Sequence, residues 1–307
     1  MKVALPDLVS NSYFPAIAAI ELGCFRDEGL DMEFELIHPV PATFAALRDG
    51  RVDFVAGSAH APLWAFPRWA GSKIVASLAQ GMYWFLMMRA DLKVARGDLS
   101  ALRGRRIVAA NGVDMGLRGL LAAAGIDIAQ EGIEIGPLPG GVPQGVSFGV
   151  AAVDALAAGT VDGLWANGMA AEKAVTSGVA SIVLDVRRGD GPKAAFHFTQ
   201  PALVTTDRMI AAQPDAVAGA VRAIVRTQKM LKSDPGLATK VGEKLFPALE
   251  AGLIRRLIER DLPYYDAAVT AEFTAGMNGF AQRMGMLDAP VPHDDIVATQ
   301  YRGLWRG

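Results

Sequence analysis

Cysteine and histidine are scarce in this 307-residue chain, which has one Cys and four His. Because Cys24 stands alone, no disulfide can form within the chain, and the redox compartment stays undecided. The histidines have no metal-ligand spacing with one another or with the Cys. They are His38, His60, His197 and His293. The sequence therefore predicts no disulfide framework and no metal site, and we expect no cofactor.

Runs of basic residues are also missing, and the formal net charge is −2. Nucleic-acid binding depends on Lys and Arg side chains that neutralise phosphates, so nucleic acid is not an expected partner. Hydrophobic residues make up 51% of the chain and charged residues 20%, which is enough for full globular cores. The length suits two domains of ordinary size.

A continuous apolar run is missing from the N-terminal region. Pro and Asp at 6–7 and Asn and Ser at 11–12 interrupt it, whereas a secretion signal needs about 7–15 apolar residues in a row. Glu21 stands three residues before Cys24, where a lipoprotein signal has a large aliphatic residue. No signal and no transmembrane helix is visible, so we expect no membrane insertion. We expect a periplasmic location if a signal peptide was trimmed or misannotated, and otherwise a cytoplasmic one.

The same region instead predicts the start of a folded domain. Residues 2–5, KVAL, are a short buried-strand candidate. Residues 14–25 carry apolar residues at helical spacing, and Gly29 is a helix stop. Residues 32–36 alternate apolar residues with Glu, which is typical of a half-buried strand.

One pattern occurs twice. Residues 46–61 are ALRDGRVDFVAGSAHA and residues 155–170 are ALAAGTVDGLWANGMA. In each, a Gly that can adopt the left-handed conformation ends a helix, namely Gly50 or Gly159, and a Val-Asp strand and a small-residue loop follow. Chance matching of common residues is the alternative. Two βαβ-like copies favour an α/β fold of two lobes, with mostly parallel sheets and helices on both faces.

Four loops of small residues follow expected strands. They are SNSY (10–13), GSAH (57–60), NGVDMG (111–116) and ANGM (166–169). Ligands of open parallel sheets sit beyond the carboxyl ends of the strands, where helix N-termini favour anions. Because two loops come from each lobe, we expect a small-molecule ligand in a cleft between the lobes.

Five residues of lobe one are candidate ligand contacts: Asn11, Ser12, Tyr13, Ser58 and His60. His60 could donate to an anionic ligand or act as an acid–base group, and the alternative is a loop or capping histidine. Ser12 or Asn11 could instead cap the first helix.

Six residues of lobe two are also candidates: Asn111, Asp114, Met115, Arg118, Trp165 and Asn167. Arg118 could grip a carboxylate or sulfonate with two hydrogen bonds, or could be a solvated surface residue. Asp114 would repel an anion and favour a neutral or cationic ligand, or could be only a helix cap. Trp165 would suit a planar ligand, with core packing as the alternative.

Other aromatic side chains surround these loops. We expect Trp64, Trp69, Tyr83 and Trp84 to cluster in lobe one, most of them in the core. Cys24 is expected to be a buried small hydrophobic residue.

The order of these segments resembles the substrate-binding proteins of ABC transporters for aliphatic sulfonates, nitrate and taurine, a group that includes thiamine-precursor (NMT1/THI5-like) binding proteins. Five stretches carry the resemblance, in the family's order: AIELGCFRDEGLDMEFELI (19–37), ALRDGRVDFVAG (46–57), LSALRGRRIVAANG (99–112), ALAAGTVDGLWA (155–166) and PALVTTDRMIAAQPDAVAGAVRAIVRTQKML (201–231).

The resemblance implies a type II periplasmic-binding-protein fold. Lobe one would hold residues 1–86 and 199–307, and lobe two residues 87–198, with hinge crossings near 84–92 and 194–202. The family implies that the lobes close over a small organic molecule (a sulfonate, a carboxylate or a pyrimidine-like compound) and present it to an ABC permease.

The chain departs from the family's enzymes. The thiamine-precursor synthases have a Cys-rich signature, which one Cys excludes. A desulfinase on this fold has a Cys nucleophile in the loop after the first strand, where this chain has SNSY. GSAHAPLWAFPR places His60 and Arg68 near that enzyme's His and Arg, with a different spacing. A desulfinase- or decarboxylase-like enzyme with His60 as acid–base, and a cytoplasmic ligand sensor, remain the alternatives.

Overall fold

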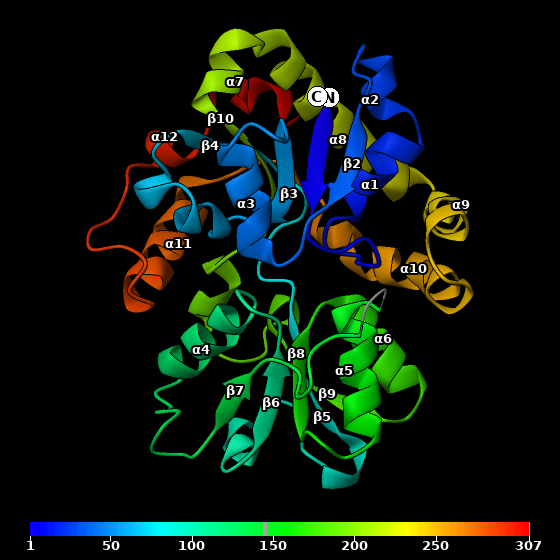
Figure 1. Cartoon of the computed structure of the whole chain (residues 1–307), viewed down its shortest axis with the longest axis vertical. Helices are drawn as coiled ribbons and strands as arrows, with labels where there is room; N and C mark the ends of the chain where they lie inside the picture. Colours follow the sequence, from blue (N-terminus) through cyan, green and yellow to red (C-terminus); the bar gives the residue numbers. More distant parts are fainter. Residues whose placement is uncertain (144–145, 307) are drawn as a thin grey trace. The chain divides into compact units, whose positions relative to one another are not determined.

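A computed structural model describes residues 1–143 and 146–306 and divides the chain into two compact units (Figure 1). Lobe one comprises Met1–Gly81 and His197–Gly307, and lobe two comprises Met82–Phe196. Each lobe contains a five-stranded sheet. The chain leaves lobe one once and returns to it once, so the two α/β lobes expected from the repeat are confirmed.

The sheet of lobe one has the strand order β2-β1-β3-β10-β4. β1 runs parallel to β2 and β3, whereas β10 runs antiparallel to β3 and β4. The reversed strand is the one by which the chain re-enters the lobe. The strands are β1 (Lys2–Leu5), β2 (Glu33–Leu36), β3 (Phe54–Ser58), β4 (Ser72–Ser77) and β10 (Pro201–Thr206).

The sheet of lobe two has the same design, with the order β7-β6-β8-β5-β9. β6 runs parallel to β7 and β8, and β5 runs antiparallel to β8 and β9. Here the reversed strand is the one by which the chain enters. The strands are β5 (Phe85–Arg89), β6 (Arg106–Ala109), β7 (Glu134–Gly136), β8 (Gly163–Ala166) and β9 (Ala180–Asp185).

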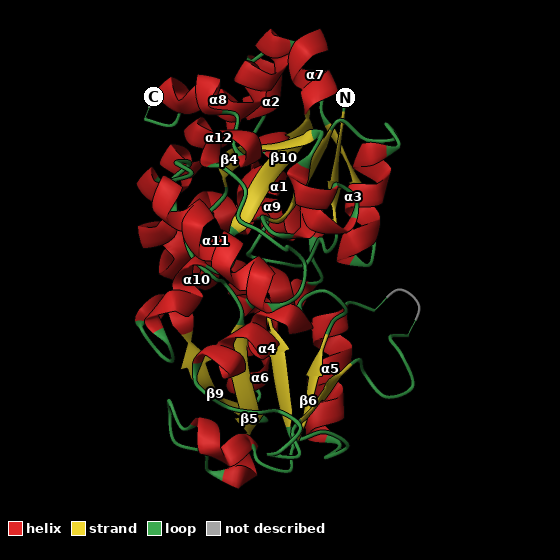
Figure 2. Ribbon diagram, turned by 90° about the vertical axis from the view of Figure 1, so that its left-hand side faces the viewer, coloured by secondary structure: helices red, strands yellow, loops and turns green. Residues whose placement is uncertain are grey.

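Helices cover both faces of each sheet. In lobe one, α3 lies on one face and α8 on the other, and in lobe two α4 lies on the side opposite α5 and α6 (Figures 1 and 2). The α-helices of lobe one are α1 (Phe14–Glu21), α2 (Cys24–Asp27), α3 (Val40–Arg48), α7 (Asp207–Ala212), α8 (Pro214–Ser233), α9 (Gly236–Leu245), α10 (Ala248–Asp261), α11 (Ala271–Arg283) and α12 (His293–Ile296). Those of lobe two are α4 (Asp114–Ala123), α5 (Phe148–Ala157) and α6 (Gly168–Thr176).

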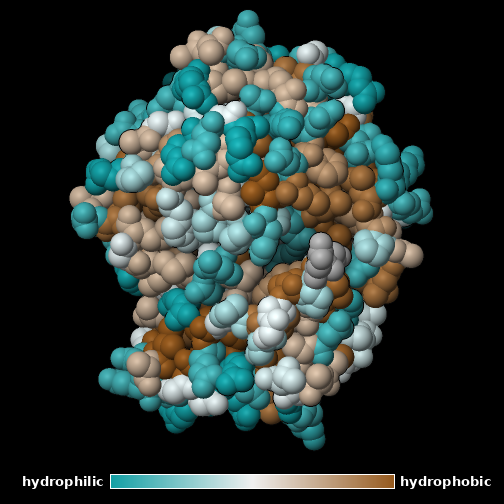
Figure 3. Space-filling model, in the orientation of Figure 1, coloured by the Kyte–Doolittle hydropathy of each residue, from teal (hydrophilic) through white to brown (hydrophobic). Residues whose placement is uncertain are grey.

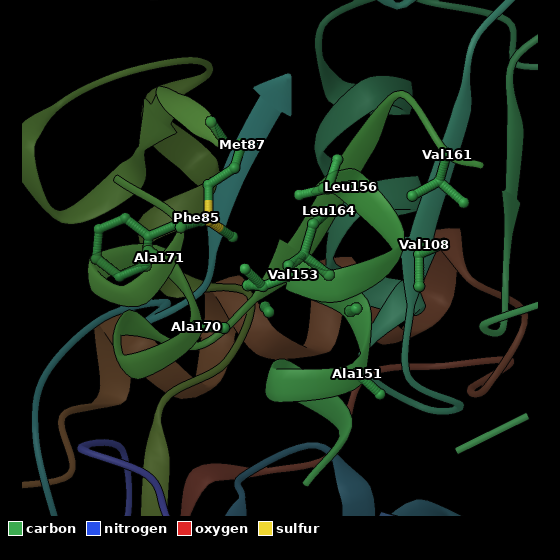
Figure 4. Close-up of a cluster of buried hydrophobic side chains, with 14 of the residues drawn as sticks. Phe85, Met87, Val108, Ala151, Val153, Leu156, Val161, Leu164, Ala170 and Ala171 are labelled. Carbon is green, nitrogen blue, oxygen red and sulfur yellow. The ribbon is translucent and has the colours of Figure 1, made fainter. Parts of the chain in front are cut away.

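The core of lobe two shows how the sheet is held in place. Phe85 and Met87 of β5 pack with Val108 of β6 and with Val153 and Leu156 of α5 (Figure 4). Burying apolar side chains of this size contributes roughly 1.5–3 kcal/mol each. This packing fixes the carboxyl ends of β6 and β8, from which the two candidate loops of this lobe start.

Both copies of the repeat fold alike. Gly50 ends α3 with φ +73° and Gly159 ends α5 with φ +70°, as expected for left-handed helix ends. Asp53 then accepts a hydrogen bond from the backbone N–H of Lys2 at 2.8 Å, and Asp162 accepts one from Arg106 N–H at 3.0 Å. The Asp of the Val-Asp pair therefore has the same structural role in both lobes, because it binds the backbone at the start of the neighbouring strand.

Two local predictions in the first unit are wrong. The single helix expected over residues 14–25 is broken, because Gly23 adopts φ +79° between α1 and α2. The half-buried alternation expected over 32–36 fails at Leu36, which is 52% exposed. β2 lies at the edge of its sheet, with a neighbouring strand, β1, on one side only.

The surface mixes hydrophilic and hydrophobic residues on the face shown in Figure 3. Among the described residues, none of the helices has both the length and the apolar character to span a membrane. Within the same residues, no group of three or more His, Cys, Asp or Glu side chains is placed to hold a metal ion.

Candidate functional site

One edge of the sheet of lobe one gathers three segments that are far apart in the sequence. The loops after β1 and β3 leave from this edge, and β10 begins there because it runs the opposite way. Pro201 pairs with Ser58, and the backbone N–H of Ala59 donates to Gln200 O at 2.9 Å. Strand order therefore brings residues 10–13, 58–60 and 198–200 to one place, at the carboxyl ends where ligands of such sheets bind.

The loop after β1 is buried, with Asn11 1%, Ser12 2% and Tyr13 4% exposed. The alternative that Ser12 or Asn11 caps the first helix is wrong. The residue at the N-cap of α1 is Tyr13, and its side chain makes no capping hydrogen bond. The side chains of Asn11 and Ser12 therefore do not cap α1.

Asn11 is oriented by an acid from the far end of the chain. Its Nδ2 donates to Oδ2 of Asp261, at the end of α10, over 2.6 Å. Asp261 is itself buried, and its Oδ1 lies 3.8 Å from Nε of Arg260. Because Nδ2 faces the carboxylate, the acceptor Oδ1 of Asn11 is turned elsewhere. Across the described part of the chain, this Oδ1 and the Oγ of Ser12 are buried with no hydrogen-bond partner.

His60 is fully buried beside Ser58. Its Nδ1 lies 2.9 Å from Oγ1 of Thr199, and the ring makes edge contacts with Trp64 and Phe280 at centroid distances of 5.4 Å. The hydroxyl of Thr199 can donate or accept, so the contact is compatible with either neutral tautomer. His60 precedes a short 3₁₀ helix, but its side chain makes no capping bond, so the capping alternative is wrong.

Gln200 joins this cluster. Its side chain is fully buried, and among the described residues neither Oε1 nor Nε2 has a hydrogen-bond partner. Leaving a buried polar group unsatisfied costs about 1–3 kcal/mol. Within the described residues, Asn11, Ser12 and Gln200 each have at least one such atom, and all three lie at this sheet edge. This arrangement is expected where a bound molecule supplies the missing partners.

In lobe two, an ion pair joins the first residue of α4 to the residue one turn later. Arg118 Nε donates to Asp114 Oδ2 at 2.9 Å, and Arg118 Nη2 donates to the carbonyl of Ile135 at 2.7 Å. Asp114 also accepts from Gly112 N–H at 3.1 Å. The charges of Asp114 and Arg118, which favour opposite kinds of ligand, therefore offset each other. Asn111 is exposed and Met115 half-buried in the same segment.

The two remaining candidates of lobe two are held within the lobe. Trp165 is fully buried, its Nε1 donates to the carbonyl of Val113 at 3.1 Å, and its ring lies 6.1 Å from that of Trp84. Asn167 caps α6, because its Oδ1 accepts from the N–H groups of Met169 and Ala170 at 3.0 and 3.1 Å. Val113 thus ties the loop before α4 to the end of β8.

The expected aromatic cluster of lobe one is divided between the lobes. Trp64 and Trp69 belong to lobe one, whereas Tyr83 and Trp84 belong to lobe two, with ring centroids 4.7 Å apart. The prediction is wrong because the chain crosses over at Gly81–Met82, just before this aromatic pair.

A model of the family described as NMT1/THI5 like matches residues 10–238. The chain belongs to this family. The resemblance found in the sequence is thereby confirmed, since the matched region contains all five of its stretches. No curated protein matches the chain.

Solved structures resemble this NMT1/THI5-like chain along nearly its whole length. The alkanesulfonate-binding protein SsuA from Xanthomonas axonopodis pv. citri is 15% identical with a TM-score of 0.70, and the match covers 96% of this chain and 97% of SsuA. The nitrate-binding protein NrtA from Synechocystis PCC 6803 is 16% identical with a TM-score of 0.70, covering 99% and 86%. The desulfurization enzyme DSZB is 15% identical with a TM-score of 0.67, covering 98% and 97%. These likenesses confirm the expected type II two-lobe fold.

Sequence reasoning missed Thr199, Gln200 and Asp261 in this NMT1/THI5-like chain. The sequence predicts residues 194–202 only as a hinge crossing, although two polar residues directly before a strand are a signal for the sheet edge at which ligands bind. Recognising it required knowing that β10 runs antiparallel beside β3. Asp261 offered no local signal, because its partner Asn11 lies 250 residues away.

Proposed function

We propose that this chain is a substrate-binding protein that captures a small organic molecule for ABC-type import. The observation that carries the proposal is a set of buried polar atoms at the carboxyl-end edge of the lobe-one sheet. Among the described residues, Asn11 Oδ1, Ser12 Oγ and both amide atoms of Gln200 have no hydrogen-bond partner. Family membership and the likeness to SsuA and NrtA support it.

The proposed site extends over both lobes. In lobe one it comprises Asn11, Ser12, Tyr13, Ser58 and His60, to which we add Thr199 and Gln200. In lobe two it comprises Asn111, Asp114, Met115, Arg118, Trp165 and Asn167. The lobes would close over the ligand by bending at crossings near residues 84–92 and 194–202, and the closed form would be recognised by a permease. A periplasmic location belongs to this proposal, and a cytoplasmic one to the alternatives below.

An enzyme is the second candidate, because DSZB shares the fold. His60 would then be the acid–base group. Cys24 is a poor nucleophile for such a reaction. It is fully buried in α2, its Sγ lies 3.6 Å from Sδ of Met230, and burial raises the pKa of its thiol. A nucleophilic thiol needs the opposite, namely exposure and a lowered pKa.

A thermal-shift screen followed by mass spectrometry of the bound compound separates the two. The panel contains sulfonates, sulfinates, nitrate, aromatic carboxylates, amines and pyrimidines. A molecule that binds only the folded chain stabilises it by about 2.7 kcal/mol at a hundred times its Kd, so a ligand raises the melting temperature. A compound that returns unchanged supports the binding protein. A compound that returns desulfinated or decarboxylated, with turnover lost in His60→Ala, would make the chain an enzyme.

A further inference from the structure

The hydrogen-bonding character of the ligand follows from which atoms at the edge lack partners. Asn11 gives its donor Nδ2 to the Asp261 carboxylate at 2.6 Å. A carboxylate beside the Arg260 guanidinium accepts hydrogen bonds, so the Asn11 amide cannot be reversed without losing this bond. Among the described residues, the atom of this amide left without a partner is therefore Oδ1, an acceptor that has no hydrogen to donate. Whatever binds there must supply an N–H or O–H.

Gln200 restricts the chemistry of the ligand further than Asn11 does. Both Oε1 and Nε2 are buried, and in the described residues neither has a partner. A bare oxyanion, such as nitrate or a sulfonate, could accept from Nε2 but would leave Oε1 unsatisfied. A group with a donor next to an acceptor satisfies both atoms at once.

The two amides belong to one connected framework. Asn11 is joined to Asp261, at the end of α10, and the next turn brings the carbonyl of Tyr264 to the backbone N–H of Gln80 at 2.7 Å. Gln80 lies just after β4, two residues beyond Leu78. The backbone N–H of Leu78 donates at 2.8 Å to the carbonyl of Pro201, which is the residue that follows Gln200. The segment 261–264 therefore braces the Asn11 side of the edge against the Gln200 side.

We propose that the ligand presents an amide-like edge to lobe one, with at least two N–H or O–H donors next to its acceptors, and is not a bare oxyanion. The two donors would donate hydrogen bonds to the two buried acceptors, Asn11 Oδ1 and Gln200 Oε1. Carboxamide, urea, amidine and sulfonamide groups have this character. The proposal rests on the proposed binding function and narrows it, because SsuA and NrtA are named for donor-free anions.

Isosteric ligand pairs test the proposal on the intact chain. Each pair keeps the shape and exchanges donors for oxygen: an alkanesulfonamide against the alkanesulfonate, and benzamide against benzoate. Dissociation constants are measured by calorimetry or NMR titration. The amide member of a pair is expected to bind about tenfold tighter or more, because the oxyanion leaves a buried acceptor unsatisfied. Equal or tighter binding of the oxyanion members, or no binding by any member, would overturn the proposal.

Gln200→Met provides the second arm, with Gln130→Met on an exposed residue as the matched control. Met fills the volume of Gln without its polar atoms, so the preference for the amide member should disappear. The melting temperature of the ligand-free variant should not fall, because the amide has no partner in the described chain. A lowered melting temperature with the preference intact would assign Gln200 a purely structural role and refute the proposal.

Failure of this inference and failure of the proposed function are distinguishable. Oxyanions that bind and return unchanged contradict the amide-like edge and leave the binding protein standing. An amide that binds but returns hydrolysed supports the amide-like edge and contradicts the binding protein.

Discussion

Asp53 and Asp162 make the same hydrogen bond in the two lobes, each to the backbone N–H at the start of the neighbouring strand. The reciprocal bonds are also the same, since Asp53 N–H donates to Lys2 O and Asp162 N–H donates to Arg106 O, both at 2.9 Å. An Asp at the equivalent position of each lobe thus anchors the start of a parallel strand, β1 in lobe one and β6 in lobe two. The repeat in the sequence is therefore a structural repeat and not a chance match.

The first prediction concerns these acids. Asp53→Ala and Asp162→Ala should each lower the free energy of unfolding by about 1–2 kcal/mol, because a strand N–H loses a charged acceptor. Urea unfolding followed by circular dichroism measures the change. Asp288→Ala, at an exposed position, is the control and should be within about 0.5 kcal/mol of the parent. Losses at 53 and 162 no larger than at 288 would show that the repeat has no energetic role.

The second prediction concerns the packing that supports the lobe-two loop. A Cβ on Gly116, in the first turn of α4, would lie 2.5 Å from Cζ3 of Trp84. Gly116→Ala should therefore cost about 1–3 kcal/mol through overpacking. Gly252→Ala, in α10, has nothing within 4 Å of the added Cβ and should stabilise the chain by about 0.4–1 kcal/mol. Thermal unfolding of both variants tests this prediction. If the two substitutions changed the stability by the same amount and in the same direction, the proposed clash with Trp84 would be refuted.

The third prediction concerns pH. His293 begins α12, its Nδ1 lies 2.9 Å from Oγ1 of Thr274, and burial lowers its pKa. The folded chain therefore binds fewer protons at His293 than the unfolded chain, whose imidazole titrates near 6.5. This contribution to stability is complete above pH 6.5 and is lost as pH falls through the folded value.

His293→Gln removes that titration while keeping a polar side chain. The difference in unfolding free energy between parent and variant should shrink as pH falls from about 7.5 to about 5, because only the parent loses the His293 contribution. The comparison isolates His293 from the other histidines, which both proteins share. A difference that stays constant over this range would contradict the prediction.

Local chemistry allowed the sequence to determine much of the architecture by itself. Gly50 and Gly159 mark helix ends because only a residue without Cβ readily adopts a positive φ there. The Val-Asp repeat determined that there are two similar lobes, and the five ordered stretches determined the family. The sequence also predicted small-residue loops after β1, β3, β6 and β8, because Gly, Ser, Asn and Ala gather behind these apolar strands.

Only the tertiary structure decided which side chains meet at that edge and which do not. Thr199 reaches His60 across 139 positions, and Asp261 reaches Asn11 across 250. Arg118 and Asp114, candidates for opposite kinds of ligand, proved to be partners of each other. Such pairings depend on the order and direction of strands, above all on β10 running backwards beside β3, and this is settled by the packing of the whole lobe. Periodicity and capping act within a few residues, so they specify elements and leave the partners to the fold.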